Sequence, residues 1–379
     1  MFPPSLQPPH PQSSYLVSMK QLICTIAVWA FGCLPLNGQA DTLQGSSGRA
    51  VALPLAFLTP ETSWGFGAAG IYTFRLPGEP PSSRPSQLQL GGAYTLEKQL
   101  LLYLPFQFFK HEERSNLYGE LGYYRYTYYF YGVGNAYPDY EGELFDLEFP
   151  RVRLAAVRRP GSSAWYLGGQ YWLDRMKVSG LEPQGLLFNV NVPGKEGGLL
   201  SAAGLVALLD HRDNVFYPSA GGYLELSSLH SMAAIGSDFD FSKFTLDGRK
   251  YWSRDGQHVV ALNAYLEWNT GTPPFTHLGF IGGTRRMRGY YEGRFRDRQL
   301  AIFQAAYRFP LIWRFKAVIF AGLGNVAHDW GSMALGNTRW AVGAGLRFLL
   351  LKEERAHVRL DYGIGQNSSG VYITVGEAF

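Results

Sequence analysis

Cysteine is almost absent from this chain, and histidine is sparse. The two cysteines, Cys24 and Cys33, lie near the start, and none follows them up to Phe379. Disulfide bridges and thiolate metal sites are therefore excluded from the body of the protein. The eight histidines are dispersed, and neither an H-E-x-x-H nor a G-x-S-x-G motif occurs. We predict that the protein binds no metal, needs no cofactor and is not an enzyme.

Long hydrophobic runs are scarce as well. The one apolar run, residues 22–36, is too short to cross a hydrocarbon core of about 30 Å as a helix. It follows Met19-Lys20 and precedes Gly38-Gln39-Ala40, an ending that suits a signal peptidase. We predict an over-extended start over 1–18, a cleaved signal peptide over 19–40 and one mature domain over 41–379.

Charged residues are few. They make up 17% of the chain, against 15% aromatic and 46% hydrophobic residues, yet the mean hydropathy is only −0.11. This combination is typical of a membrane β-barrel, because lipid-facing and lumen-facing side chains alternate and cancel in the average. The net charge of +4 is modest and the basic residues are scattered. No nucleic-acid partner is therefore predicted.

Helical periodicity is lacking after residue 41, and alternation with period two takes its place. In residues 356–366, for example, His357, Arg359 and Asp361 alternate with apolar residues. Clusters of Gly, Pro, Asp and Asn separate such runs. We predict an all-β fold, a closed transmembrane antiparallel β-barrel of 16 strands. The predicted strands are residues 51–58, 64–76, 87–95, 99–110, 116–129, 146–158, 164–179, 200–210, 222–231, 239–252, 258–270, 299–309, 314–326, 338–350, 356–366 and 370–379.

A soluble β-sandwich would show the same alternation. The composition of the face opposite the apolar one therefore decides between the two folds. In residues 338–350 that face carries Arg339 and Arg347 among alanines and glycines, which suits a crowded lumen better than an open solvent surface. Tyrosines also crowd residues 123–129, as in the aromatic girdles of barrels. The predicted location is the bacterial outer membrane, whose lipid is the first expected partner.

With an even number of strands, the N-terminal and C-terminal ends of the chain both emerge on the periplasmic side. The first strand must then pair with the last, because an open sheet edge cannot sit in hydrocarbon. Pro54 weakens the first strand, and Gly370 and Gly376 weaken the last. We predict the weakest seam of the barrel there. Phe379 is expected to end the last strand as an aromatic at the membrane interface.

The connection 271–298 holds the densest arginine cluster. Residues 282–297 read GGTRRMRGYYEGRFRD and contain five arginines. Such a segment either tucks into a polar lumen or solubilises an exposed extracellular loop. A second motif, DHRDNVFYPSAG over 210–221, has the residue types of a tight turn.

These motifs together resemble the BamA/TamA superfamily of outer-membrane assembly and translocation proteins, also called bacterial surface antigens. The RGF/RGY signature of that family matches Arg288-Gly289-Tyr290, and its D-x-RDN-x-F-x-P-x-x-G turn matches residues 210–221. Segments 57–67, 306–310 and 376–379 match as well. The resemblance therefore extends over essentially all of 51–379.

The resemblance implies that the arginine-rich extracellular loop, between the eleventh and twelfth strands, folds back into the lumen. There Arg288 would bind the inner wall. The wall motif F-x-D of the family corresponds to Phe320-Ala321-Gly322, which lacks the Asp, so Asp361 or Glu267 are candidate substitutes. The loop residues carried over are Arg285, Arg286, Arg288, Gly289, Tyr290 and Arg294. The carried-over residues of the expected periplasmic turn are Asp210, Arg212, Asp213, Asn214, Pro218 and Gly221.

The implied function is to assist the insertion or translocation of outer-membrane components at the seam. Assembly factors of this family carry periplasmic POTRA domains before the barrel, whereas only about ten residues separate Ala40 from the first predicted strand. A separate periplasmic or POTRA-bearing partner and unfolded outer-membrane clients are the expected partners. The alternative is a passive pore in which the arginine loop forms an anion-biased constriction.

Overall fold

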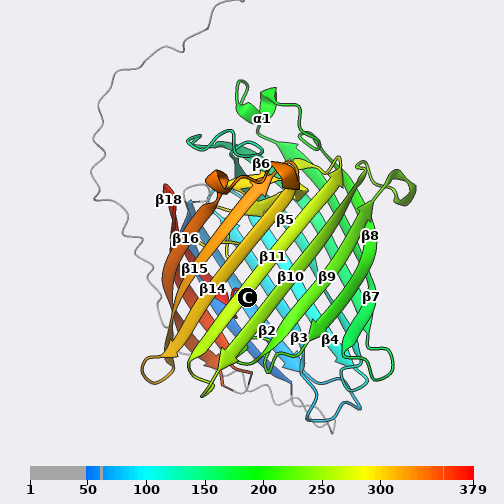
Figure 1. The fold of residues 1–379 in the computed structure, drawn as a ribbon, viewed down its shortest axis with the longest axis vertical. Coiled ribbons are helices and arrows are strands. Elements are labelled where there is room, and N and C mark those ends of the chain that lie inside the picture. Colours follow the sequence, from blue (N-terminus) through cyan, green and yellow to red (C-terminus); the bar gives the residue numbers. More distant parts are fainter. Residues whose placement is uncertain (1–47, 60–62, 353) are drawn as a thin grey trace, which may run out of the picture. The chain divides into compact units, whose positions relative to one another are not determined.

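One large antiparallel sheet makes up most of the structure. The computed structural model describes residues 48–59, 63–352 and 354–379. The predicted start extension, 1–18, and signal peptide, 19–40, lie outside them. Sixteen strands follow one another in chain order, and the sheet curls into a barrel (Figure 1). The strands are β1 Arg49–Thr59, β2 Ser63–Phe74, β3 Ser86–Thr95, β4 Leu100–Lys110, β5 Ser115–Phe130, β6 Glu143–Arg158, β7 Trp165–Ser179, β8 Gly197–Asp210, β9 Gly221–Ser231, β10 Phe241–Ser253, β11 Val259–Gly271, β14 Gln299–Pro310, β15 Phe315–Ala327, β16 Arg339–Leu351, β17 Ala356–Gly365 and β18 Ser368–Val375.

The remaining elements are short and lie in the connections. A two-stranded sheet pairs β12, Gly279–Ile281, with β13, Phe295–Asp297. The helical segments are α1 Leu186–Asn189, η1 Ala233–Ile235, η2 Phe275–His277, η3 Trp330–Ser332 and η4 Leu335–Asn337. None of the helices in the described part of the chain is long and apolar enough to cross a membrane.

The polar face of the strands turns inward, as the alternation predicted. In β17, His357 and Arg359 are 2% exposed and Asp361 is fully buried, whereas Leu360 and Ile364 are 40% and 41% exposed. Every strand of the large sheet pairs with its chain neighbours in antiparallel register, so this division between two faces continues from strand to strand.

An arginine on the lipid-facing side should be costly. We expect Leu360→Arg to lower the free energy of unfolding by about 2–4 kcal/mol, because the guanidinium would sit in hydrocarbon. Ser227→Arg is the matched control, since Ser227 is half-buried and lies opposite the inward, buried Val206. Urea unfolding in lipid vesicles measures both. Equal losses for the two variants would contradict the assignment of faces.

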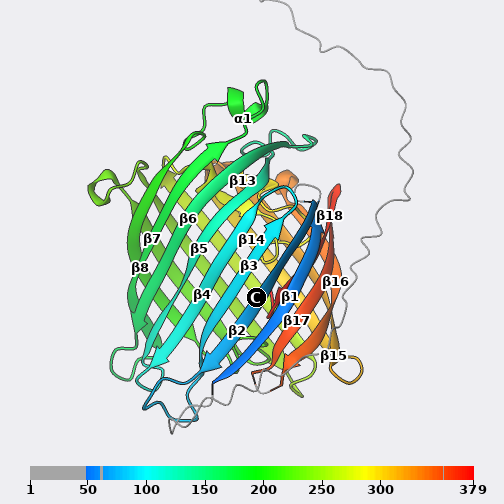
Figure 2. The ribbon, with the colours of Figure 1, turned by 180° about the vertical axis from the view of Figure 1, so that it is seen from behind.

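Closure of the sheet differs from the prediction. The ladder order begins at β1 and ends at β18, and within the described residues no hydrogen-bonded ladder joins these two strands. Pro54 in β1 has no N–H to donate, and β18 has only eight residues. The two edge strands nevertheless lie side by side after the sheet has curled (Figures 1 and 2).

The last strand also ends earlier than predicted. β18 stops at Val375 rather than running to Phe379, and Gly376 follows with φ of +81°. Phe379 is only 4% exposed and packs in an inner cluster with Tyr251 and Phe320. The prediction of an aromatic at the membrane interface is therefore wrong, because the chain turns inward after β18.

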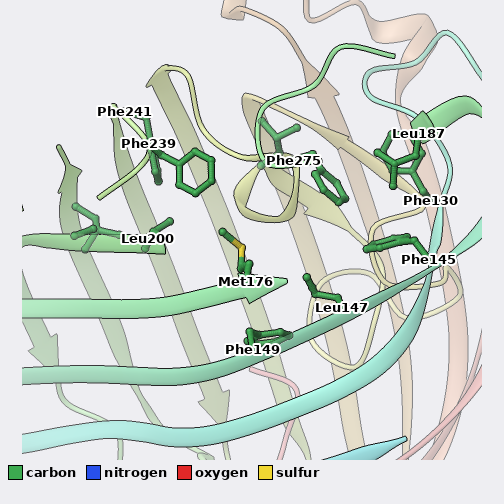
Figure 3. Packing of buried hydrophobic residues seen from close by; sticks show 13 residues of the cluster. Phe130, Phe145, Leu147, Phe149, Met176, Leu187, Leu200, Phe239, Phe241 and Phe275 are labelled. Atoms are coloured by element: carbon green, nitrogen blue, oxygen red, sulfur yellow. The ribbon is translucent and has the colours of Figure 1, made fainter. Parts of the chain in front are cut away.

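The lumen is apolar toward the end that carries the long connections. A cluster of buried side chains gathers there from β5 to β10, α1 and η2 (Figure 3). Phe275 of η2 packs edge-on against Phe130 and Phe145, with ring centroids 5.6 and 5.4 Å away. The inner wall is thus not polar throughout. The connection between β11 and β14 is held by hydrophobic packing as well as by charge.

Candidate functional site

The arginine-rich connection between β11 and β14, residues 272–298, is the candidate site. It contains η2 and the β12–β13 pair, and a hydrogen bond from Gly283 N to Tyr290 O at 3.1 Å folds its tip back. Gly282 has φ of +115°, and a Cβ there would lie 1.9 Å from the carbonyl oxygen of Tyr291. Only glycine fits this position, so the sequence itself enforces the reversal.

Arg288-Gly289-Tyr290 lies flat against the inner face of β17. A Cβ at Gly363 would stand 2.7 Å from the Arg288 carbonyl carbon, and one at Gly365 would stand 2.4 Å from the Tyr290 ring. Gly289 itself has φ of +120°. The loop backbone can approach the strand this closely because glycines stand on both sides of the contact.

Tyr290 and Gly289 tie the loop to β16, β17 and β18. The Tyr290 hydroxyl donates to the Trp340 carbonyl at 2.7 Å and accepts from the Gln366 N–H at 2.8 Å. Gly289 N donates to the Tyr372 hydroxyl at 2.9 Å, and that hydroxyl donates to the Tyr290 carbonyl at 3.0 Å. The motif therefore fastens the last three strands of the sheet from inside.

The Arg288 side chain is 2% exposed and is bound from two sides. Its Nη1 donates to Asp361 of β17, and its guanidinium carbon lies 3.6 Å from the centroid of the Phe320 ring in β15. Asp361 is one of the two acceptors that the strand pattern suggested. Gly322, where the family has Asp, faces Met287 and Gln304 instead.

Arg288 belongs to a buried network of charges. Arg347 Nη1 contacts Asp361 at 2.5 Å, and Arg359 Nε lies 3.7 Å from the same carboxylate. Arg347 also binds Glu377, at 2.9 Å through Nε. All members are 4% exposed or less at the side chain, including Arg308, which lies 3.6 Å from Glu377. Four guanidiniums thus share two carboxylates, and the Phe320 ring and main-chain carbonyl oxygens supply further contacts.

The C-terminal residues enter this network. Glu377 reaches β14 and β16 through its two arginine partners, and its N–H donates to the Phe216 carbonyl at 3.2 Å. Arg308 donates to the main-chain oxygen of Phe379 at 2.8 Å. These contacts hold the tail after β18, residues 376–379, inside the barrel. The alternation of residues 338–350 predicted Arg347 on the lumen face, whereas neither Arg308 nor Glu377 was predicted to take part.

The other loop arginines have separate surroundings. Arg286 donates to the Tyr265 hydroxyl at 2.5 Å and lies 3.7 Å from Glu267. Arg294 donates to the Pro138 carbonyl at 2.5 Å, in the connection between β5 and β6. Arg285 has an exposed side chain, and its carbonyl accepts from Gln304 at 3.0 Å. The loop thus contacts walls on several sides of the lumen rather than standing free at the surface.

His277 of η2 binds the opposite wall. Its Nε2 lies 2.9 Å from the Asp174 carboxylate of β7. Burial lowers the pKa of His277 to about 4. The imidazole is therefore neutral at pH 7 and can donate one hydrogen bond to Asp174.

Acid should loosen this contact. The folded pKa of His277 lies below its unfolded value near 6.5, so the unfolded or detached form binds the proton more readily. The stability of the docked loop is therefore complete above pH 6.5 and falls as the pH drops toward 4. Protease cleavage within 272–298 should become faster over that interval. In His277→Gln, cleavage should not become faster between pH 6.5 and pH 4. If the variant shows the same pH profile as the wild type, His277 is not the group that loosens the loop.

The 210–221 motif forms the turn between β8 and β9. Asp213 accepts from the Ser219 N–H at 2.7 Å, and Asn214 accepts from Tyr217 N–H at 2.8 Å. Gly221 has φ of +90° and leaves no room for a side chain.

Other members of the turn connect it to its surroundings. Arg212 pairs with Asp210 at 2.9 Å, and the Pro218 carbonyl accepts from Arg308 at 2.9 Å. Arg355, in the turn between β16 and β17, binds Asp213 at 2.8 Å. These contacts support a structural role for the motif. No group of three or more potential metal ligands occurs in the described ranges.

The chain matches known outer-membrane proteins in sequence pattern and fold. Residues 85–379 match the Omp85 superfamily domain. BamA from Haemophilus ducreyi lacking POTRA domains 1–3 superposes with a TM-score of 0.51 at 11% identity, over 87% of this chain and 69% of that one. No curated protein matches significantly.

Two CdiB structures are also similar. CdiB from Acinetobacter baumannii has a TM-score of 0.56 at 11% identity, over 88% of this chain and 60% of its own. CdiB from Escherichia coli has a TM-score of 0.51 at 14% identity, over 87% and 62%. The chain thus spans less than two thirds of either CdiB. The domain match covers more than half of the chain, and the chain therefore belongs to the Omp85 superfamily of bacterial outer-membrane β-barrel proteins.

Proposed function

We propose that this barrel assists the insertion or translocation of outer-membrane components through the seam between β1 and β18. The observation that carries the proposal is the sheet order, in which fifteen neighbouring pairs form ladders and the two end strands form none with each other in the described residues. Contacts near the start of β1 connect β1 and β2 to the turn between β16 and β17. Glu354 lies 3.9 Å from Arg49 and accepts from the Thr73 hydroxyl at 3.3 Å.

At a seam without a hydrogen-bonded ladder, the edge strands offer backbone N–H and C=O groups to an incoming strand. Each unpaired N–H or C=O costs several kcal/mol in hydrocarbon, so β1 and β18 gain free energy when a client strand supplies the missing hydrogen bonds. Such β-augmentation recognises backbone rather than sequence. A barrel that uses it can accept many unfolded clients.

The lumenal loop would supply the rigid side of this seam. Gly289 and Tyr290 bind β16, β17 and β18, and Arg288 joins β17 to β15. Because the loop holds the last strands from inside, β18 can separate from β1 while β15, β16 and β17 keep their positions. A periplasmic or POTRA-bearing partner would deliver the clients.

The alternative function, an anion-biased pore, has less support. An arginine-rich lumen favours it, but the same loop and the apolar cluster around Phe275 occupy the interior. A conducting pore needs a hydrated path past these groups.

Reconstitution separates the two functions. Purified protein in liposomes should accelerate the folding of a small model barrel over the rate in lipid alone, and planar bilayers should show little steady conductance. High, salt-dependent anion conductance without faster client folding would support the pore and contradict our proposal.

A further inference from the structure

The outward face of β4 to β7 carries two cations, Lys110 and Arg158, at the ends of β4 and β6. Lys110 pairs in register with Ser115, and Ser115 pairs with Arg158. Residues directly opposite in antiparallel strands point to the same face, so both cations stand in one row, two strand spacings or about 10 Å apart. Leu167, 52% exposed, continues the row on β7 and places it on the lipid side.

The next row toward the membrane centre forms a hollow. It runs from Phe108 through Leu117 to Ala156 and then Gly169. Two small residues stand next to larger ones, so the surface is recessed over β6 and β7. A groove of about 500 Å³ lies beside it. Phe108, Leu117 and Ala156 of this row line it, together with Lys110, Ser115, Arg158 and Leu167 of the row at the strand ends. Strands β4 to β7 are neighbours across this face (Figure 2).

The position of the two cations matches one leaflet of the membrane. They flank the short connections 111–114 and 159–164, whereas the longest connection, 272–298, lies at the other end of the strands. Short turns are periplasmic in outer-membrane barrels, so this row meets the headgroups of the periplasmic leaflet. Within the described residues, neither Lys110 nor Arg158 forms an ion pair.

We propose that this groove binds an anionic glycerophospholipid of the periplasmic leaflet. The phosphate would lie between Lys110 and Arg158, with Ser115 as a hydroxyl donor between them. One acyl chain would run over Leu117 and Ala156 toward the membrane centre. Charge alone would attract any anion, but the apolar recess directly beside the cations selects an anion that carries a hydrocarbon chain.

The site can be tested with dioleoylphosphatidylglycerol added to the detergent-solubilised barrel. Native mass spectrometry should show one lipid that survives activation. The double variant Lys110→Gln with Arg158→Gln should weaken its binding at least tenfold. Ala156→Phe should weaken it similarly, because it fills the groove and leaves the charge unchanged. Both variants should keep the heat-modifiable gel shift of the folded barrel.

Lys250→Gln is the matched control. Lys250 is an exposed cation that pairs in register with the lipid-facing Leu262, near the short-turn end of β10. Its removal should leave lipid binding unchanged. Inorganic phosphate at equal concentration should not displace the lipid, and displacement would make this an anion site without lipid recognition. Equal binding by wild type and either groove variant would overturn the proposal.

Discussion

Asp361→Ala should cost about 3–5 kcal/mol of unfolding free energy, the largest loss that we expect from one substitution on the inner wall. Asp361 is fully buried and contacts Arg288 and Arg347, with Arg359 3.7 Å away. Its removal leaves three buried guanidiniums without this carboxylate, and of the three Arg347 retains its ion pair with Glu377. An unpaired buried charge costs far more than the net value of the pair.

Asp247→Ala is the control for this prediction. Asp247 also faces the lumen and pairs with an arginine, Arg249, but both side chains retain partial exposure, 14% and 20%. Water can replace the lost partner there, so we expect a loss of about 1 kcal/mol or less. Urea unfolding in vesicles, followed by the gel shift of the folded barrel, compares the two. Similar losses would mean that the Arg288 network contributes no more than an ordinary lumenal pair.

Locking the seam should abolish client insertion while the barrel stays folded. Ala52 in β1 and Ile373 in β18 both lie on the outward face. Ala52 is exposed and pairs with Gly70, on the same face of β2 as the exposed Tyr72, and Ile373 pairs with the exposed Leu360. Cysteines at these two positions, joined by a flexible bis-maleimide, would tether the edges. The acceleration of client folding should then fall to the rate in lipid alone.

A tether elsewhere in the sheet is the control. Leu346 and Leu360 are direct partners in β16 and β17, and both are exposed to lipid. Joining them constrains strands that a ladder already holds, so full activity should remain. If the seam tether leaves client folding unchanged at high crosslinking yield, lateral opening between β1 and β18 has no part in the activity.

The sequence predicted most of the sheet because a strand has a period of two. Alternation in β17 alone separates His357, Arg359 and Asp361 from the lipid-facing residues, and the structure confirms that division. Strand ends were less certain. The sixth predicted strand began at residue 146, whereas β6 begins at Glu143, which accepts hydrogen bonds from Leu186 and Leu187 of a distant connection.

What the sequence could not reveal depends on contacts between distant segments. The three-residue strands β12 and β13 are too short to show alternation. The tail was predicted as strand up to Phe379 because its local pattern continues, but Glu377 is drawn inward by Arg308 and Arg347, which lie on other strands. The apolar lumen around Phe275 was missed for a similar reason. Periodicity predicts the face of the strand on which a side chain lies, but not which distant residues contact that face.

Photocrosslinking at the seam tests the central proposal most directly. A benzoylphenylalanine at Ala52 on the β1 edge should capture a model client during its insertion. The same probe at Leu205 should capture little, because this outward residue, 71% exposed, lies on β8, a strand that pairs with β7 and with β9. Adducts at Ala52 that appear and decay with client folding are the predicted result. Client folding that is accelerated while neither position forms adducts, or both form them equally, would contradict strand templating at the seam.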